Sequence, residues 1–179
     1  MTFEVLKATE DVAEELGFIH ATSYRRAYRG IVPDNILAEY TPQKRAAAFR
    51  QAIAKDEDEI YLFKVNHSAV GFAVLNKHPH YPGAAEDEAE INALFFLPDF
   101  WGMDAASRAL AFCFNRLRLL GYKRATVWVM EGNDRARRFF EKNGFLPTGE
   151  KRAIQIGLYL VEHQLIAELK HTINPVDEE

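Results

Sequence analysis

One segment of this sequence combines an apolar run, a proline and a turn in an order that can bind an anion. The run AEINALFFL ends at Pro98, and the turn PDFWG leads into a helical pattern that begins near Asp104. Backbone N–H groups at the start of a helix lack partners within the helix, and the helix dipole makes this end positive. The segment from Trp101 to Ala106 is therefore expected to bind a negatively charged group such as a phosphate.

The other residues with nucleophilic or metal-binding chemistry form weaker patterns. Cys113, the single cysteine, lies in the apolar run ALAFCFNRL, which favours a buried thiol over a nucleophile. His78 and His80 are separated by one residue, and His20 lies in a predicted helix, but no cysteine or acidic residue stands at metal-ligand spacing from them. We therefore expect no metal site, and a single cysteine indicates a reducing compartment.

The composition is typical of one folded domain rather than a fibrous, repetitive or disordered chain. The 179 residues are 48% hydrophobic and 27% charged, and 10 glycines and 7 prolines accompany 13 phenylalanines and 7 tyrosines. This is enough apolar material for a single core. We expect one domain over residues 1–173, followed by an acidic tail over residues 174–179.

The charge balance and the N-terminal segment indicate the kind of partner and the compartment. The chain has 26 acidic and 22 basic residues, a net charge of −4, which gives no electrostatic reason to expect nucleic acid. Acidic residues precede any apolar segment of secretory length, and no run of about twenty apolar residues follows. We expect a cytoplasmic protein without a membrane span that binds a small molecule or another protein.

Hydrophobic periodicity and turn residues predict the elements that position these groups. The expected strands lie at residues 3–6, 59–65, 69–75, 89–97, 124–130 and 155–169. The expected helices lie at residues 11–28, 42–54, 104–120 and 135–143. Asn133 is expected to cap the last helix, and Gly121 and Gly144 are expected to end the last two helices.

The order of these elements predicts the sheet. Segments 59–65 and 69–75 are joined by a tight turn and form an antiparallel hairpin. The strand, helix and strand between Ile91 and Met130 form a parallel pair with a right-handed crossover. We therefore expect an α/β (α+β) fold in which a mixed sheet carries helices on both faces.

Three segments resemble the GNAT family of acetyl-coenzyme A-dependent N-acetyltransferases. AEINALFFLPDFWGMDAASRAL is similar to the family's central motif, a strand and a proline-containing turn followed by Q/R-x-x-G-x-G/A. YRRAYRGIVPDNIL is similar to the substrate-side segment of many bacterial members. NDRARRFFEKNGF is similar to the motif N-x-x-A-x-x-x-Y-E-K-x-G-F, matched here by Asn133, Ala136, Glu141, Lys142, Gly144 and Phe145. The resemblance implies a mostly antiparallel sheet with a splayed parallel strand pair.

The resemblance implies acetyl-coenzyme A as co-substrate. In the family, the splayed strands leave backbone groups unpaired, and the pantetheine arm pairs with them as a strand would. The basic run Arg135, Arg137 and Arg138 either neutralises the distal phosphates or is an ordinary solvated helix face. The implied coenzyme-binding residues are Leu94, Phe95, Phe96, Trp101, Gly102, Met103, Asp104, Ala105, Ala106, Asn133, Arg137 and Phe140.

The resemblance also implies the catalytic groups. A lysine-like amine has a pKa near about 10.4 and must lose a proton before it attacks. Glu90 stands where some members carry the general base, and the backbone N–H near Phe96 would stabilise the oxyanion. Alternatively, Glu90 only ends an acidic stretch and water acts as the base. The acceptor is expected to be a primary amine on a small molecule, a polyamine or a peptide.

Two departures from the family pattern bear on function. Asp104 replaces the central glycine of the turn, where its carboxylate could cap the helix and occupy the anion site, or pair with Arg108. Phe140 replaces the tyrosine that protonates the leaving thiolate and cannot donate a proton. Tyr24, Tyr28 and Tyr81 either stand in for that tyrosine on the acceptor side or are half-buried surface aromatics. The segments that contain them, YRRAYRG and the loop KHPHYPG, either shape the acceptor pocket or are ordinary surface.

These departures leave two alternatives to an acetyltransferase. One is a binding or sensor module of the same fold with a degraded coenzyme site. The other is a structural subunit that forms a homodimer through its terminal strands.

Overall fold

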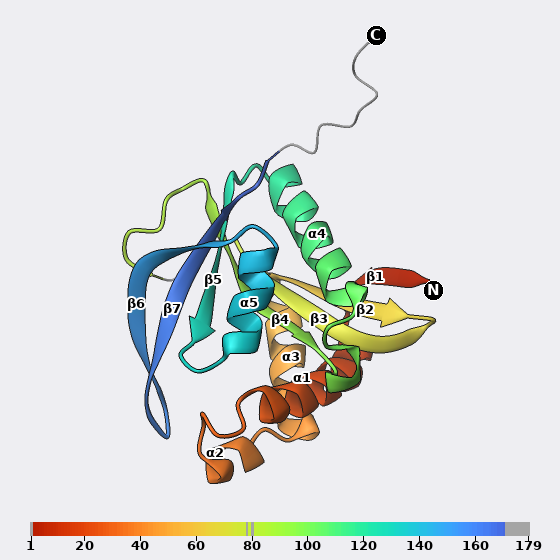
Figure 1. Ribbon diagram of the computed structural model, residues 1–179. Coiled ribbons are helices and arrows are strands. Elements are labelled where there is room, and N and C mark those ends of the chain that lie inside the picture. The colour runs from red at the N-terminus through yellow and green to blue at the C-terminus, as the bar shows by residue number, and fades with distance from the viewer. Residues whose placement is uncertain (1, 78, 80, 171–179) are drawn as a thin grey trace.

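The computed structural model of the chain describes residues 2–77, 79 and 81–170 and is built on a seven-stranded sheet (Figure 1). The strand order is β1-β2-β3-β4-β5-β7-β6, and every pair is antiparallel except β4 with β5. The predicted mixed sheet is therefore confirmed. The strands are β1 (Phe3–Lys7), β2 (Glu59–Val65), β3 (Ser68–Asn76), β4 (Glu88–Phe96), β5 (Arg124–Met130), β6 (Leu146–Ile156) and β7 (Leu158–Glu168).

Helices cover both faces of the sheet, as predicted. On one face, α4 and α5 bury Leu110, Cys113 and Phe140 against the central strands. On the other face, α1 and α3 pack Leu16 and Phe49 against β2 and β3. The helices are α1 (Ala13–Ala27), α2 (Asp34–Ala38), α3 (Pro42–Lys55), α4 (Asp104–Leu119) and α5 (Asp134–Lys142), with short 3₁₀ helices η1 (Glu10–Val12) and η2 (Pro98–Phe100).

The ends of the helices follow local sequence signals. The Asn133 side chain accepts a hydrogen bond from the Ala136 N–H at 3.3 Å and caps α5, as predicted. Gly121 and Gly144 follow α4 and α5 with φ values of 95° and 93°, a backbone conformation that glycine adopts without strain. The C-terminal end of α4 and both ends of α5 are thus encoded locally.

The C-terminal part of the chain differs from the prediction. The expected strand over residues 155–169 is a hairpin that turns at Gly157, and its first strand, β6, extends back to Leu146. Most residues of β6 are exposed, so the segment lacks the apolar alternation that identifies a strand in a sequence. A Cβ on Gly157 would lie 2.6 Å from the Ile36 side chain, which places the hairpin tip against α2, a helix that was not predicted.

Some predictions concern residues that the structure does not describe. His78, His80, the end of the expected domain at residue 173 and the acidic tail 174–179 lie outside the described residues. Within the described residues, no helix is long and apolar enough to cross a membrane.

Candidate active site

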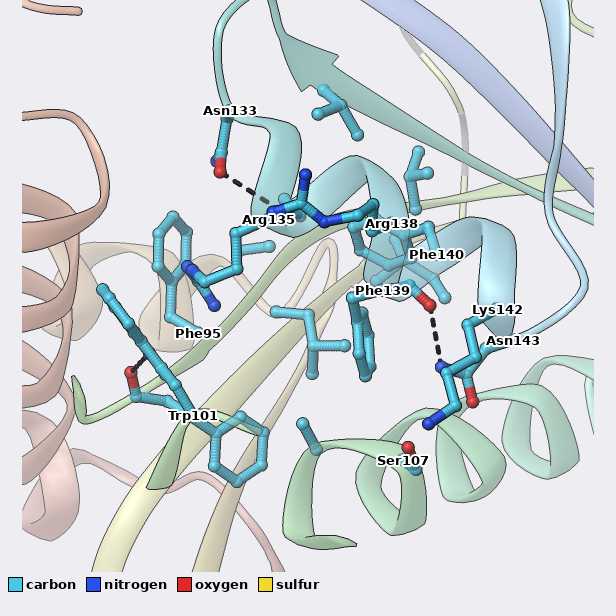
Figure 2. A pocket seen from close by; sticks show the side chains of 18 of the residues that line it. Phe95, Trp101, Ser107, Asn133, Arg135, Arg138, Phe139, Phe140, Lys142 and Asn143 are labelled. Carbon is cyan, nitrogen blue, oxygen red and sulfur yellow. Dashed lines mark hydrogen bonds between the residues drawn. The ribbon is translucent and has the colours of Figure 1, made fainter. Parts of the chain in front are cut away.

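The central feature of the fold is a gap between the two parallel strands. The pairing of β4 with β5 comprises Glu88, Ala89 and Glu90 opposite residues 124–126 and ends there. Beyond that point the strands diverge, which confirms the predicted splay. A cavity of about 320 Å³ occupies the gap and is lined by residues 91–96 of β4, 127–129 of β5, the start of α4 and one side of α5 (Figure 2).

The edge of β4 presents polar backbone groups to this cavity. The Leu97 N–H donates to the Val70 carbonyl at 2.8 Å, so Leu97 bonds toward β3. Neighbouring residues in an antiparallel ladder direct their backbone groups to opposite sides. The N–H and C=O groups of Phe96 and Leu94 therefore point into the gap, whereas those of Phe95 point toward β3.

The charged side chains that line the cavity are all cationic. Arg135, Arg138 and Lys142 come from one side of α5, and the residues that line the cavity include neither aspartate nor glutamate. None of the three cations forms an ion pair with another of the described residues. Burial lowers the pKa of the Arg135 guanidinium below its ordinary value. The site is suited to an anionic ligand.

The structure corrects the position expected for Arg137. Its guanidinium forms an ion pair with Glu141 at 2.9 Å, and it lines a second, smaller cavity beside β6 rather than the gap. The reason is the helical period, which turns residue 137 away from the side that carries residues 135, 138 and 142. That period was readable in the sequence and would have selected Lys142, which was not predicted as a ligand.

The turn before α4 contributes part of the predicted anion site. Gly102, Met103 and Ala106 line the cavity, whereas Asp104 and Ala105 do not. Asp104 is exposed and makes no capping hydrogen bond at the start of α4. The expected plugging of the turn by this carboxylate is therefore not observed.

The expected pair of Asp104 with Arg108 is also absent from the described residues. The Arg108 guanidinium instead lies over the Phe3 ring, 4.8 Å from its centroid.

Trp101 has two contacts at the mouth of the gap. Its indole N–H donates to the Phe96 carbonyl, with 2.7 Å between the indole nitrogen and the oxygen. The Arg135 guanidinium carbon lies 3.6 Å from the centroid of the Trp101 ring (Figure 2). These contacts connect the turn, the edge strand and α5.

Tyr28, at the end of α1, is the one predicted acceptor-side tyrosine that lines the cavity. Burial, followed by the nearby Glu162 carboxylate, raises the pKa of Tyr28 to about 12, although a hydrogen bond with the Asn133 side chain opposes the shift. The phenol therefore keeps its proton at neutral pH. Phe140 lines the same cavity and packs against Phe145.

The other two predicted tyrosines lie outside the cavity. Tyr24 is buried and stacks on Tyr40 with ring centroids 3.9 Å apart, a packing role. Tyr81 meets the Trp128 ring edge to face at 5.4 Å, and its hydroxyl is buried without a hydrogen-bond partner.

Glu90 is buried at the closed end of the gap, with 2% of its surface exposed. Its neighbours Ala89 and Ile91 pack toward α4, so the Glu90 side chain faces the opposite side of the sheet. The Arg152 guanidinium lies 3.8 Å from the Glu90 carboxylate and also bonds Glu162 at 2.6 Å. Arg152 belongs to β6, the strand that the sequence did not reveal.

Two further expectations concern residues away from the gap. Cys113 is fully buried in α4, and burial raises the pKa of its thiol to about 12, as expected for a packing residue. Burial, together with the Arg45 charge, lowers the pKa of His20 to about 4, so that its imidazole is neutral among aromatic rings. The described residues contain no cluster of metal-ligating side chains.

Comparison with known proteins identifies the family. A sequence profile of the acetyltransferase (GNAT) family matches residues 21–145, more than half of the chain. The chain belongs to the GNAT acetyltransferase family. The resemblance inferred from the sequence motifs is thereby confirmed.

Individual relatives of this GNAT domain agree with the assignment. It is 26% identical over 144 residues to an uncharacterized N-acetyltransferase of Archaeoglobus fulgidus, a match that covers 76% of this chain and 88% of that protein. The solved structure of paia N-acetyltransferase from Thermoplasma acidophilum, in complex with coenzyme A, has a TM-score of 0.73 at 16% identity, covering 94% of this chain and 99% of that one. The structure of yncA from Salmonella typhimurium, with its cofactor acetyl-CoA, has a TM-score of 0.65 at 15% identity and covers 98% of both chains. These likenesses show the GNAT fold.

The gap of this GNAT domain fits the coenzyme used by the family. The inward-facing N–H and C=O groups of Leu94 and Phe96 can pair with the amides of a pantetheine arm. Arg135, Arg138 and Lys142 can neutralise phosphates at the mouth. Membership of the family supports acyl transfer as the activity.

Proposed function

We propose that the protein is an N-acetyltransferase that moves the acetyl group of acetyl-coenzyme A to a primary amine by direct attack. The observation that carries this proposal is the gap beyond Glu90, which combines an unpaired strand edge with three cationic side chains and no acidic one. An extended ligand with amides at one end and phosphates at the other complements both features.

In the proposed complex, Phe96 and Leu94 bind the pantetheine arm and the α5 cations bind the phosphates. Gly102, with φ at 78°, provides a bare backbone segment at the start of the phosphate turn. When bound, the coenzyme supplies the activated acetyl group. The Phe96 N–H donates a hydrogen bond to the thioester oxygen, where negative charge develops as the amine attacks.

Proton transfer is assigned to Glu90 and Tyr28. The amine loses a proton as its nitrogen bonds the acetyl carbon and the carbon–sulfur bond breaks. Glu90 receives that proton through intervening water, because six residues of strand, about 20 Å, separate it from Phe96. Tyr28 gives its phenolic proton to the leaving thiolate, a role that Phe140 cannot perform. The raised pKa of Tyr28 keeps that proton in place until the thiolate forms.

The acceptor approaches from the side of the sheet opposite α4. Glu90 faces that side, and Tyr28 reaches the cavity from the end of α1. The two reactants thus meet within the gap from opposite faces. Tyr81, over Trp128, forms part of the acceptor wall on the same side as Glu90.

Isothermal titration calorimetry with acetyl-coenzyme A tests the proposal, followed by an assay of thiol release with a panel of primary amines. We expect one coenzyme per chain and amine-dependent thiol release. No binding at millimolar coenzyme would overturn the proposal.

A second measurement tests the alternative that Asp104 suggests, a binding or sensor module with a degraded coenzyme site. If Asp104 does not weaken coenzyme binding, the dissociation constants of the unmodified protein and of the Asp104→Gly variant agree within a few-fold. The reason is that salt screens the charge of an exposed side chain outside the cavity. A large gain in affinity on substitution would instead favour the degraded-site alternative.

A further inference from the structure

The side chain of Trp101 occupies a hydrogen-bonding position on the β4 edge that an incoming ligand needs. The Phe96 carbonyl points into the gap, and the Trp101 indole N–H donates to it at 2.7 Å. An amide N–H of a strand-like ligand would approach the same carbonyl from the same side. The indole ring also lines the cavity and bounds it next to this carbonyl.

Arg135 stacks on the face of the Trp101 indole. Its guanidinium carbon lies 3.6 Å above the ring, and Figure 2 shows Arg135 beside Trp101 at the mouth of the cavity. Among the described residues, Arg135 forms no ion pair with a carboxylate, and its guanidinium instead lies over the Trp101 ring face. The stack thus keeps Arg135 away from ligand phosphates and Trp101 on the strand edge.

We propose that Trp101 competes with the coenzyme for the Phe96 carbonyl, and that coenzyme binding displaces the indole and releases Arg135 to the phosphates. This inference rests on the proposed function, because it assumes that the gap receives the pantetheine arm. Trp101 is then a residue that sets coenzyme affinity. Only the fraction of molecules in which the indole has left the strand edge binds directly, so the apparent affinity is reduced by that fraction.

The hydrogen bond from the indole and the stacking on Arg135 can be separated by one substitution. Trp101→Phe removes the N–H donor and keeps an aromatic face for Arg135. If the indole competes with the coenzyme, calorimetry will give an acetyl-coenzyme A dissociation constant about three- to tenfold lower in the variant, the gain expected when one competing hydrogen bond is removed. An unchanged or higher dissociation constant overturns the inference.

A spectroscopic measurement detects the displacement of the indole directly and does not depend on a difference in affinity. The chain has two tryptophans, so its ¹H–¹⁵N spectrum contains two indole signals, and the one lost in Trp101→Phe identifies Trp101. Saturation of the unmodified protein with coenzyme A should move this signal upfield, as expected when a hydrogen bond to a carbonyl is lost. A Trp101 signal that stays in place under saturation overturns the inference.

The outcomes distinguish this inference from the proposed function. If the unmodified protein gives no heat with millimolar acetyl-coenzyme A, the proposed function fails and the competition fails with it. If the coenzyme binds but Trp101→Phe binds no more tightly, the proposed function stands and only the competition is wrong.

Discussion

Glu90 of β4 and Thr126 of β5 are the last residues that face each other across the two parallel strands, and the cavity begins directly beyond this pair. The carboxylate of Glu90 therefore lies at the closed end of the gap, six residues before Phe96 along β4. The role of Glu90 as general base can therefore be tested by substitution.

Glu90→Gln should lower kcat/KM for the amine by about 10² to 10⁴ at neutral pH, the usual contribution of a positioned base. The deficit should shrink as the pH approaches the amine pKa of about 10.4, because solvent then deprotonates the substrate. Steady-state kinetics across pH 7 to 10 measures both effects. The matched control is Glu88→Gln, two residues earlier on the same strand and also buried. An equal loss in that variant would remove the role of Glu90.

Tyr28→Phe should lower kcat by about tenfold or more while the coenzyme dissociation constant changes little, because only the proton donor is removed. With a pKa of about 12, Tyr28 stays protonated up to pH 10, so the size of the loss should not vary over pH 6 to 10. Tyr122→Phe is the control, since the Tyr122 hydroxyl donates to the Lys77 carbonyl at 2.7 Å and does not line the cavity. Full activity in Tyr28→Phe would assign the proton to water.

Arg135→Gln should raise the dissociation constant of acetyl-coenzyme A by about tenfold, because it removes a charged hydrogen-bond donor from the mouth of the gap. Arg137→Gln, two residues along the same helix, should leave that constant unchanged, since its guanidinium pairs with Glu141 and lines the other cavity. Calorimetry compares the two variants. Equal effects would mean that the overall charge of α5 matters and the direction of its side chains does not.

The ion pair between buried Glu59 and partly exposed Arg116 predicts how stability depends on pH. The Arg116 guanidinium donates to the two carboxylate oxygens of Glu59 at 2.7 and 2.6 Å, and this holds the pKa of Glu59 below its ordinary value of 4.5. A folded-state pKa below the unfolded value means that the carboxylate stabilises the protein above about pH 4.5, and that this contribution is lost as the pH falls through the folded-state pKa.

Glu59→Gln should therefore reduce the free energy of unfolding by about 1–3 kcal/mol at pH 7 and flatten its decline below about pH 4.5. Urea unfolding between pH 7 and pH 3 measures both quantities. Glu141→Gln, which breaks a surface pair on α5, should cost less than about 0.5 kcal/mol. A Glu59 variant with the same pH dependence as the unmodified protein would contradict the assignment.

Local signals in the sequence were sufficient to predict most elements and the family. Asn133 and Gly144 delimit α5, Gly121 ends α4, and the apolar run before Pro98 forms β4, because caps, glycine turns and hydrophobic periods act within a few residues of one another. β6 was missed because its solvent-exposed residues do not alternate between apolar and polar.

The sequence by itself determined the order of the elements around the gap, the motifs of the GNAT family and the turn that precedes α4. Only the tertiary structure decided that Arg152 reaches Glu90 and that Trp101 bonds the Phe96 carbonyl. The physical reason is that local structure depends on neighbouring residues, whereas these contacts join side chains from separate elements and exist only once those elements pack.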